Sequence, residues 1–439
     1  MGVSRTLLVG GVSATHDALL AAALRGHGLD AEPIGTPDGR ALATGRLLLA
    51  RAHCNPTYYL AGALVERLRK KLAQGQTRSE VIARYAHLTV GSCGPCRFAT
   101  YAAEHRRALD GAGLAGVPVV VIDQLQPQRS EALAAIGVAL DGRLLASLAR
   151  AVIAADVLVA AGCAARARTT HADTVDNLID NARAAIERAF AERQSVATIC
   201  ARLGQDLARA TDTTPRTPLR VRLIGELFAA NTEGHGGYRL VRWLEARGAI
   251  VEPPRVSEWL SYLAWQVRRD VERRLGFFAP DGGPRGLLGR DGPLLARHAR
   301  AAERSLAIVY RRWSRAAGLT TPLADMDDLA TLARPHYHTD LRAGMGHLEV
   351  GAFLAAERDR SADLVVSVKP FGCLPSSALS DGVLAVLARR ARHVGFVSVE
   401  TTGDADALVE SRLELALERA RDHQSTQRRS MAASAPESA

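Results

Sequence analysis

The feature that most constrains the fold is an alternation, along the whole chain, of short apolar runs with longer amphipathic stretches. The longer stretches carry apolar residues at helical spacing and lie at residues 16–24, 130–155, 173–207 and 238–247. The short runs have the length and composition of β-strands and lie at residues 6–11, 88–90, 117–123, 157–162, 221–226, 249–252, 364–368 and 394–399. Strands that alternate with helices form parallel sheets, so the sequence predicts an α/β fold.

The chain is long enough for two domains. Its 439 residues exceed what one ordinary hydrophobic core organises. A polar, proline-bearing segment at residues 211–218 predicts the boundary. We therefore expect an N-terminal α/β domain at 1–210 and a C-terminal α/β domain with a helical insertion at 219–420. Residues 421–439 end in a stretch rich in Ser and Ala and are expected to form a disordered tail.

Composition argues against several classes of protein. No run reaches the ~18 apolar residues of a membrane span, and the first residues resemble a β-strand more than a signal peptide. Six cysteines in so long a chain do not make a disulfide scaffold, so we expect a cytoplasmic protein. The net charge of +10 comes mainly from arginines spread over helical segments. Because the sequence has neither a basic block nor an RNA-binding motif, no nucleic-acid partner is expected.

Three cysteines share one local pattern, Cys-x-Pro before a helix-patterned stretch: Cys54-Asn-Pro, Cys93-Gly-Pro and Cys373-Leu-Pro. Proline favours the first turn of a helix, so each thiol should lie at a helix N-terminus, where the helix dipole favours the metal-binding thiolate. Cys93 and Cys373 also follow predicted strands, and ligands of open α/β sheets bind at the carboxyl ends of strands. Together with Cys96, these cysteines predict one metal or cofactor site built from both halves of the chain.

The sequence alone leaves other interpretations of the cysteines open. Cys163 and Cys200 lie in apolar surroundings and are expected to be buried core residues. The dithiol Cys93-Gly-Pro-Cys96 is also the active-site tetrapeptide of thioredoxins, although Ser92 stands where those proteins have tryptophan. Zinc accepts four thiolates, but zinc sites usually pair two Cys-x-x-Cys motifs, whereas iron–sulfur clusters accept scattered ligands. The residues therefore favour an iron–sulfur cluster.

Several longer motifs occur together between Leu7 and about Arg419. They are His53-Cys-Asn-Pro-Thr-Tyr58, Gly91-Ser-Cys-Gly-Pro-Cys-Arg-Phe98, Ile224-Gly-Glu226, Val256-Ser-Glu-Trp-Leu-Ser-Tyr262, Lys369-Pro-Phe-Gly-Cys-Leu-Pro-Ser-Ser377 with Ser380-Asp-Gly382, and Glu400-Thr-Thr-Gly-Asp404. In this order they resemble the 2-hydroxyglutaryl-CoA dehydratase and benzoyl-CoA reductase-related superfamily, in the branch associated with acyl-CoA dehydratase activases.

The resemblance implies two Rossmann-like parallel-sheet domains with helical insertions and a [4Fe–4S] cluster, for which Cys54, Cys93, Cys96 and Cys373 are the expected ligands. It also implies a separate activase-type ATPase chain that drives electrons onto the cluster. The chain would then be the low-potential, lyase-like component that dehydrates or reduces a CoA thioester by radical chemistry. A non-catalytic electron-relay or metal-binding protein and a dithiol oxidoreductase remain alternatives, and a dimer is one option for the oligomeric state.

The chain departs from the family pattern at Ala99-Thr-Tyr101 and at Met345, where an acidic residue is expected, and this leaves the substrate class open. No residue is assigned a catalytic role from the sequence. The residues whose chemistry suits proton donation or metal ligation are Glu226, His347 and Glu349. The alternative for each is a solvated loop residue or a core polar residue whose hydrogen bonds are satisfied. Arg97 could stabilise cluster or phosphate charge, and residues 401–404 could bind an anion or form a plain turn.

Overall fold

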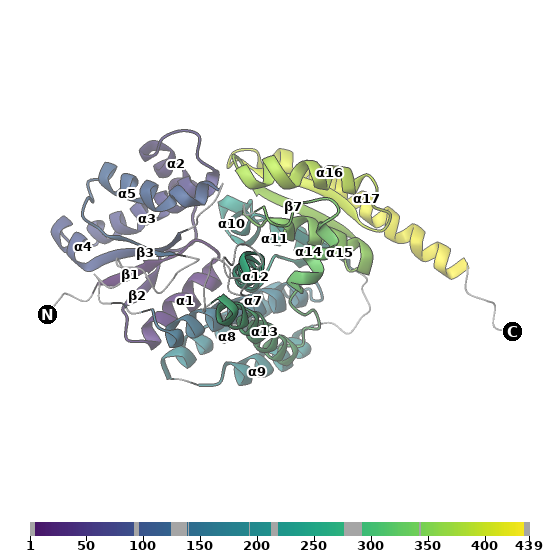
Figure 1. Ribbon diagram of the computed structural model, residues 1–439, viewed down its shortest axis with the longest axis horizontal. Coiled ribbons are helices and arrows are strands. Elements are labelled where there is room, and N and C mark those ends of the chain that lie inside the picture. The colour runs from purple at the N-terminus through teal and green to yellow at the C-terminus, as the bar shows by residue number, and fades with distance from the viewer. Residues whose placement is uncertain are drawn as a thin grey trace.

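The computed structural model describes residues 5–91, 96–123, 138, 140–192, 194–211, 218–275, 292–341 and 344–433. Over these residues the protein has an α/β fold with two four-stranded sheets, in which all the strand pairs are parallel (Figure 1). The strand orders are β2-β1-β3-β4 and β6-β5-β7-β8, so the two sheets have the same topology. The predicted fold class of two parallel-sheet α/β units with helical insertions is confirmed.

The first sheet is covered by helices on both faces. Leu8 of β1 packs with α3, α4 and α5, whereas its neighbours Leu7 and Val9 pack on the opposite face with α1 and with α7 (Gly142–Arg166). This alternation follows from the two-residue period of a β-strand. The elements of this half are β1 (Thr6–Val9), α1 (Ala14–Gly26), β2 (Ala31–Pro33), α2 (Gly39–Leu48), α3 (Asn55–Ala73), α4 (Arg78–Arg84), β3 (Tyr85–Gly91), the 3₁₀ helix η1 (Arg97–Thr100), α5 (Tyr101–Gly111) and β4 (Val119–Asp123).

The second sheet repeats this arrangement. Val366 of β7 packs with α11 and α17 on one face, and Val365 packs with α15 and α16 on the other. The elements of this half are β5 (Leu219–Gly225), α10 (Leu227–Asn231), η3 (His235–Gly237), α11 (Leu240–Glu245), β6 (Ala249–Glu252), α12 (Val256–Leu275), α13 (Gly292–Ala316), α14 (Met326–Ala333), α15 (His347–Asp359), β7 (Leu364–Pro370), the π-helical turn η5 (Ser376–Ser380), α16 (Asp381–Ala388), β8 (Gly395–Thr401) and α17 (Asp406–Ala433).

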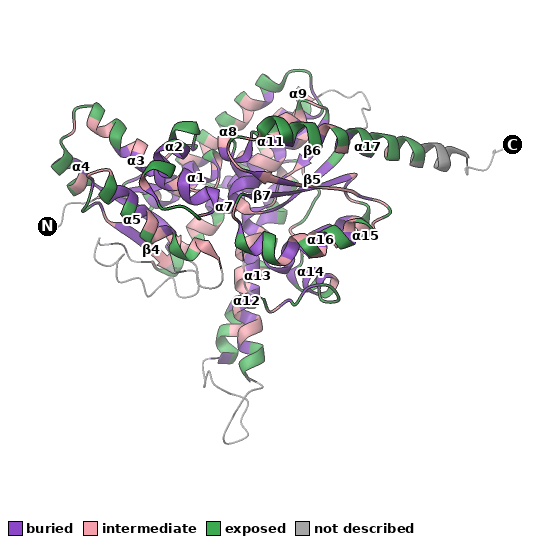
Figure 2. Ribbon diagram, turned by 90° about the horizontal axis from the view of Figure 1, so that it is seen from above, coloured by how far each residue is buried: buried purple, intermediate pink, exposed green. Residues whose placement is uncertain are grey.

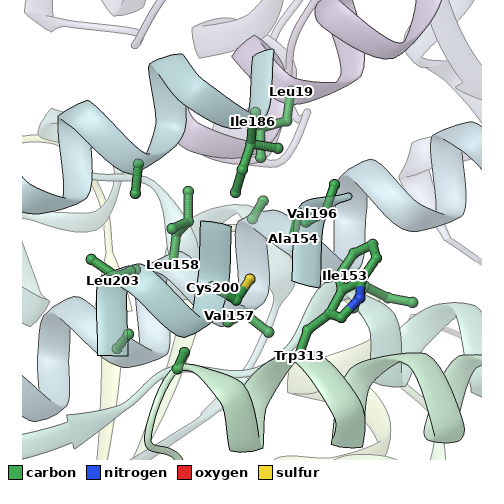
Figure 3. Close-up of a cluster of buried hydrophobic side chains, with 14 of the residues drawn as sticks. Leu19, Ile153, Ala154, Val157, Leu158, Ile186, Val196, Cys200, Leu203 and Trp313 are labelled. Atoms are coloured by element: carbon green, nitrogen blue, oxygen red, sulfur yellow. The ribbon is translucent and has the colours of Figure 1, made fainter. Parts of the chain in front are cut away.

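A helical core joins the two halves. It is formed mainly by α7 (Gly142–Arg166), α8 (Ala172–Glu192) and α9 (Val196–Ala210), with α1 from the first half and α13 from the second (Figure 3). Trp313 of α13 and Cys200 of α9 are both buried in this core. Cys163, in α7, is buried as well. The prediction that Cys163 and Cys200 are buried core residues is therefore confirmed.

The predicted strand at residues 157–162 is wrong, because this segment lies inside helix α7. The apolar run is short enough for a strand, but alanines surround it on both sides, and Asp141 caps the helix by accepting a hydrogen bond from the N–H of Leu144. By length and composition α7 could also cross a membrane. More than half of its most apolar stretch is buried in the helical core, which accounts for its composition.

Three further expectations differ from the structure or lie outside it. The stretch 173–207, expected as one helix, is the pair α8 and α9, with a break before Val196. The segment from residue 421, expected to be disordered, continues α17 as a helix to Ala433, and this helix extends beyond the body of the molecule (Figure 1). The predicted boundary segment falls largely on residues 212–217, which lie outside the described residues.

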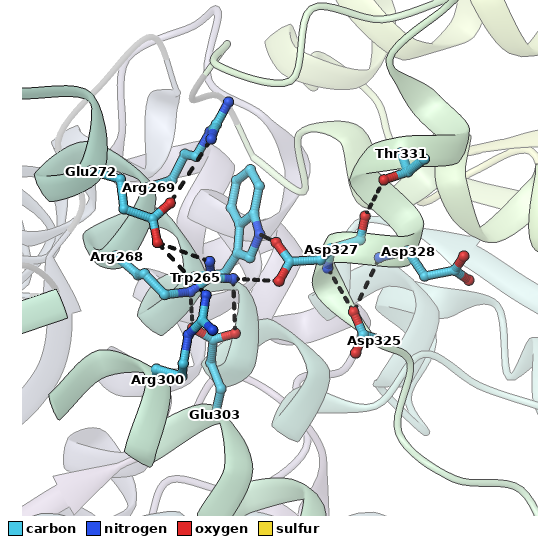
Figure 4. A network of polar contacts seen from close by, with 10 residues as sticks. All are labelled: Trp265, Arg268, Arg269, Glu272, Arg300, Glu303, Asp325, Asp327, Asp328 and Thr331. Carbon is cyan, nitrogen blue, oxygen red and sulfur yellow. Dashed lines mark hydrogen bonds and ion pairs between the residues drawn. The ribbon is translucent and has the colours of Figure 1, made fainter. Parts of the chain in front are cut away.

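Helices α12 and α13 lie side by side and project from the body of the molecule (Figure 2). Where they meet α14, the buried Arg268 donates hydrogen bonds to Glu303 of α13 over 2.9 Å and to Asp327 of α14 over 2.8 Å (Figure 4). The indole N–H of Trp265 also donates to Asp327 over 2.8 Å. A buried charge is tolerated only when it is paired, so this network fixes α12 against its neighbours.

Candidate functional site

One cavity lies where the carboxyl ends of the central strands of both sheets meet. Its volume is about 260 Å³, and it is lined by residues that end or directly follow β1, β3, β5 and β7, among them Gly10, Val90, Glu226 and Pro370. In each sheet the strand order reverses between the two central strands. Ligands of open α/β sheets bind at such switch points. The equivalent topology of the two halves therefore places two binding positions face to face.

Three of the four predicted site cysteines line this cavity. Cys54 is the N-cap residue of α3, with Pro56 in the first turn, and Cys96 is the N-cap residue of η1. Cys373 follows β7 and precedes the turn η5. The structure therefore brings thiols from both halves of the chain to one cavity, as the sequence predicts. Cys93, the fourth predicted site residue, lies outside the described residues.

Backbone contacts hold the loops of Cys54 and Cys373 together. The N–H of Asn55 donates a hydrogen bond to the carbonyl oxygen of Phe371 over 3.1 Å, and the Asn55 side-chain amide donates to the carbonyl oxygen of Thr401 over 2.8 Å. Gly372 has a φ of 76°, and a β-carbon there would lie 3.4 Å from Cα of Cys54. Glycine is suited to this position because it adopts positive φ without strain and leaves room for the other loop.

Hydroxyl groups lie within hydrogen-bonding distance of two of the sulfur atoms. Sγ of Cys54 is 3.1 Å from the hydroxyl of Tyr101 and 3.5 Å from that of Thr57. Sγ of Cys373 is 3.3 Å from the hydroxyl of Ser376. Groups of this kind orient metal ligands and tune the electronic properties of the site.

The electrostatics of the thiols differ from the expectation at the sequence level. Burial raises the pKa of Cys373 to about 12, and the nearby Glu226 adds to this effect. Burial also raises the pKa of Cys96. Desolvation of the thiolate therefore outweighs the helix dipole at these two positions, contrary to the prediction that helix starts favour the thiolate. A bound cation would reverse this balance, because a coordinated thiol is deprotonated.

Two carboxyl groups face the same cavity. Glu226 caps α10 by accepting hydrogen bonds from the N–H groups of Phe228 and Ala229, and burial raises its pKa. Glu349, on α15, accepts a hydrogen bond from Ser380 over 2.6 Å, and burial raises its pKa as well. Both side chains were candidates from the sequence, and the structure places both beside the cysteines.

His347, the third candidate of this kind, does not line the cavity. It is fully buried and packs edge-on against the rings of Tyr262 and Trp265, with centroid distances of 5.3 and 4.7 Å. Burial lowers its pKa to about 4, so the ring is neutral. His347 therefore acts as a core residue that supports the cavity wall, and its predicted role as ligand or proton donor is not what its position favours.

The suggested anion site at residues 401–404 has its donors occupied within the chain. The N–H groups of Thr402, Gly403 and Ala405 all donate to the hydroxyl oxygen of Tyr238, over 2.8, 2.7 and 3.3 Å. This segment is therefore a turn closed by a tyrosine. Arg97 lines the cavity, but its guanidinium group donates to the carbonyl oxygen of Ala52.

Apolar side chains make up most of the cavity wall, and sequence reasoning missed their role. They come from several separate elements and include Leu60, Phe98, Trp259, Leu263 and Met345. Three of these residues had a signal in the sequence: Phe98 and Trp259 lie in motifs that carry the family resemblance, and Met345 departs from the family pattern. Leu60 and Leu263 lie in ordinary helical patterns, and nothing local distinguishes them from core residues.

The donor set suits a thiolate-ligated cluster by its chemistry. Cys54, Cys96 and Cys373 are free thiols that share one cavity, and soft sulfur ligands select iron–sulfur clusters, zinc or copper. Within the part of the chain that the structure describes, however, no three side chains of His, Cys, Asp or Glu are grouped closely enough to hold a metal ion. The thiols share a cavity without forming a closed coordination set.

Comparison of the chain with protein-family models and with curated proteins gave no match.

Proposed function

We propose that this protein is an iron–sulfur redox component of the kind found in the 2-hydroxyglutaryl-CoA dehydratase and benzoyl-CoA reductase-related superfamily. The observation that supports this most is the meeting of Cys54, Cys96 and Cys373 at one cavity, although these residues come from opposite halves of the chain. We propose these three thiols, with Cys93, as the ligands of a [4Fe–4S] cluster. The proposal also retains a cytoplasmic location and a separate activase-type ATPase chain as the electron donor.

A contrast within the chain supports a ligand role for these cysteines. Cys200 packs among apolar side chains of the helical core, where its side chain contributes by filling space. Cys54 and Cys373, in contrast, each lie beside hydroxyl groups and at the edge of a cavity. A buried thiol that is surrounded by polar partners and faces open space is a poor core filler and a suitable ligand.

When bound, the cluster would supply single electrons at low potential. The residues around it would have separate tasks. The hydroxyl groups of Tyr101 and Ser376 would orient the sulfur atoms of Cys54 and Cys373. Burial raises the pKa of Glu349 and so favours the proton-bearing form of this carboxyl group beside the cavity. The apolar walls would exclude water from the reacting group.

The cavity also bears on the choice between an enzyme component and an electron relay. A relay needs its cluster shielded and near the surface, and it needs no room for a second molecule. Here apolar walls and two carboxyl groups surround open space next to the thiols. This arrangement favours the enzyme component, with an acyl-CoA thioester as the substrate of radical dehydration or reduction.

The proposal is tested by anaerobic purification followed by iron and sulfide analysis. We expect iron and sulfide in similar amounts, and an electron paramagnetic resonance signal of the reduced protein that changes when acyl-CoA thioesters are added. Stoichiometric zinc without iron would contradict the cluster. An electron paramagnetic resonance signal that no thioester changes would favour the electron-relay role. Full reduction by a mild reductant alone would argue against the ATP-driven partner, because such coupling is needed only at very low potential.

A further inference from the structure

The charged groups that line the cavity are few and mainly acidic. Of the lining residues that the structure describes, three are charged in their ordinary states at neutral pH: Arg97, Glu226 and Glu349. The guanidinium group of Arg97 is engaged with the carbonyl oxygen of Ala52 and lies beside Gly372, on the side of the cysteine loops. A ligand carboxylate in this cavity would therefore meet two carboxyl groups and no free cation among these residues.

Apolar groups dominate the rest of the cavity wall. Helix α12 contributes Trp259 and Leu263, the β3–α5 connection contributes Phe98, and Met345 precedes α15. Hydrogen bonds from Arg268 to α13 and α14 fix the position of α12, which carries Trp259 and Leu263. A rigid apolar wall gains free energy from apolar ligand surface and disfavours a charge that lacks a partner.

The volume of the cavity limits the size of its ligand. An apolar cavity of about 150 Å³ is known to hold one benzene molecule. The cavity here measures about 260 Å³, and a cluster on the thiols would take part of this space. The remaining space suits one short chain or one ring.

We infer that the cavity accepts a neutral, apolar acyl group, either a short aliphatic chain or a single ring, and rejects an acyl group that ends in a carboxylate. This inference rests on the proposed function, because it assumes that the ligand is an acyl-CoA thioester. It goes beyond that function by assigning the substrate class, and it places the selectivity in the wall formed by Trp259, Leu263 and Met345.

The test compares two thioesters that differ in their terminal group. Pentanoyl-CoA ends in a methyl group, and glutaryl-CoA ends in a carboxylate at the same position. Isothermal titration calorimetry of the full-length, anaerobically purified protein would measure both affinities, with acetyl-CoA and free CoA as references. We expect pentanoyl-CoA to bind at least about tenfold tighter than acetyl-CoA, because its three extra methylenes enter an apolar wall. We also expect it to bind at least about tenfold tighter than glutaryl-CoA.

Two variants of the cavity wall and one control variant show where the selectivity arises. Met345→Lys adds a cation to the half-buried wall and should narrow the preference for pentanoyl-CoA over glutaryl-CoA. Leu408→Lys adds the same charge at an exposed position of α17 and should leave the preference unchanged. Leu263→Trp should reduce the advantage of pentanoyl-CoA over acetyl-CoA by filling the space.

The outcomes separate the inference from the function on which it rests. Equal or tighter binding of glutaryl-CoA by the unmodified protein would overturn the inference while leaving thioester binding intact. Binding of every thioester no tighter than free CoA would contradict the acyl-CoA role itself, and the inference with it. A preference that Leu408→Lys changes as much as Met345→Lys would show that the selectivity does not arise in this cavity.

Discussion

The backbone N–H of Asn55 donates a hydrogen bond to the carbonyl oxygen of Phe371 over 3.1 Å, although 316 positions separate the two residues in the chain. Each residue is close to a cysteine that lines the cavity, Cys54 on one side and Cys373 on the other. This contact links the end of β7 to the start of α3. The two cysteine loops therefore share one backbone interface, and the candidate site depends on how firmly the two halves are held together.

Asp156 is a second junction between the halves, and its removal should destabilise the protein strongly. It is buried in α7, pairs with His16 of α1 over 3.0 Å, and accepts hydrogen bonds from the N–H groups of Val256 and Ser257 at the start of α12. Asp156→Ala should lower the free energy of unfolding by about 3–5 kcal/mol, because it leaves these partners buried and unpaired.

Chemical denaturation measures this effect, and Asp180→Ala is the matched control. Asp180 is exposed on α8 and forms a surface ion pair with Arg183. Its loss should change the free energy of unfolding by about 0.5 kcal/mol or less. Equal effects of the two substitutions would contradict the role of Asp156 as a junction.

Tyr238 should stabilise the turn that follows β8. Its hydroxyl oxygen accepts hydrogen bonds from the N–H groups of Thr402, Gly403 and Ala405. An apolar side chain at this position offers no acceptor for these groups. Tyr238→Phe keeps the ring but should lower the free energy of unfolding by about 1–3 kcal/mol. Thermal denaturation would measure the change. A melting temperature equal to that of the unmodified protein would contradict this account of the turn.

Asp17 should make stability fall as pH rises toward neutrality. Burial raises its pKa to about 7, against an ordinary value of 3.8, although the N–H groups of Gly11 and Val12 partly offset the effect. Between these two pKa values the folded state keeps a proton that the unfolded state has lost. Protonated Asp17 therefore contributes stability at low pH, and this contribution is lost as pH rises through about 7.

Unfolding free energies at several pH values, with Asp17→Asn as the control, isolate this effect. His87 acts in the opposite direction, since burial lowers its pKa to about 4 and favours the folded state as pH rises. The quantity to examine is therefore the difference in the free energy of unfolding between the unmodified protein and Asp17→Asn. This difference should fall by roughly 2 kcal/mol from pH 5 to pH 7. A difference that does not vary with pH would show that Asp17 is ionised in the folded protein.

Much of the fold and part of the site could be predicted from the sequence, because local patterns determine them. The strand that begins at Thr6 follows from periodicity, and the helix that begins beside Pro56 follows from the conformational restriction of proline. The apolar run at 157–162 was misassigned because its length fits both a strand and a buried helix segment. The tyrosine that closes the turn at 402–405 lies more than 160 positions away, so no local signal could reveal it.

The cluster is tested most simply by the iron content of matched cysteine variants after anaerobic purification. We expect about four irons per chain in the unmodified protein. Cys373→Ser, at the cavity, should lose at least about half of this iron, whereas Cys200→Ala, in the helical core, should keep it. An iron-free protein, or equal iron in both variants, would contradict the claim that these thiols hold a cluster.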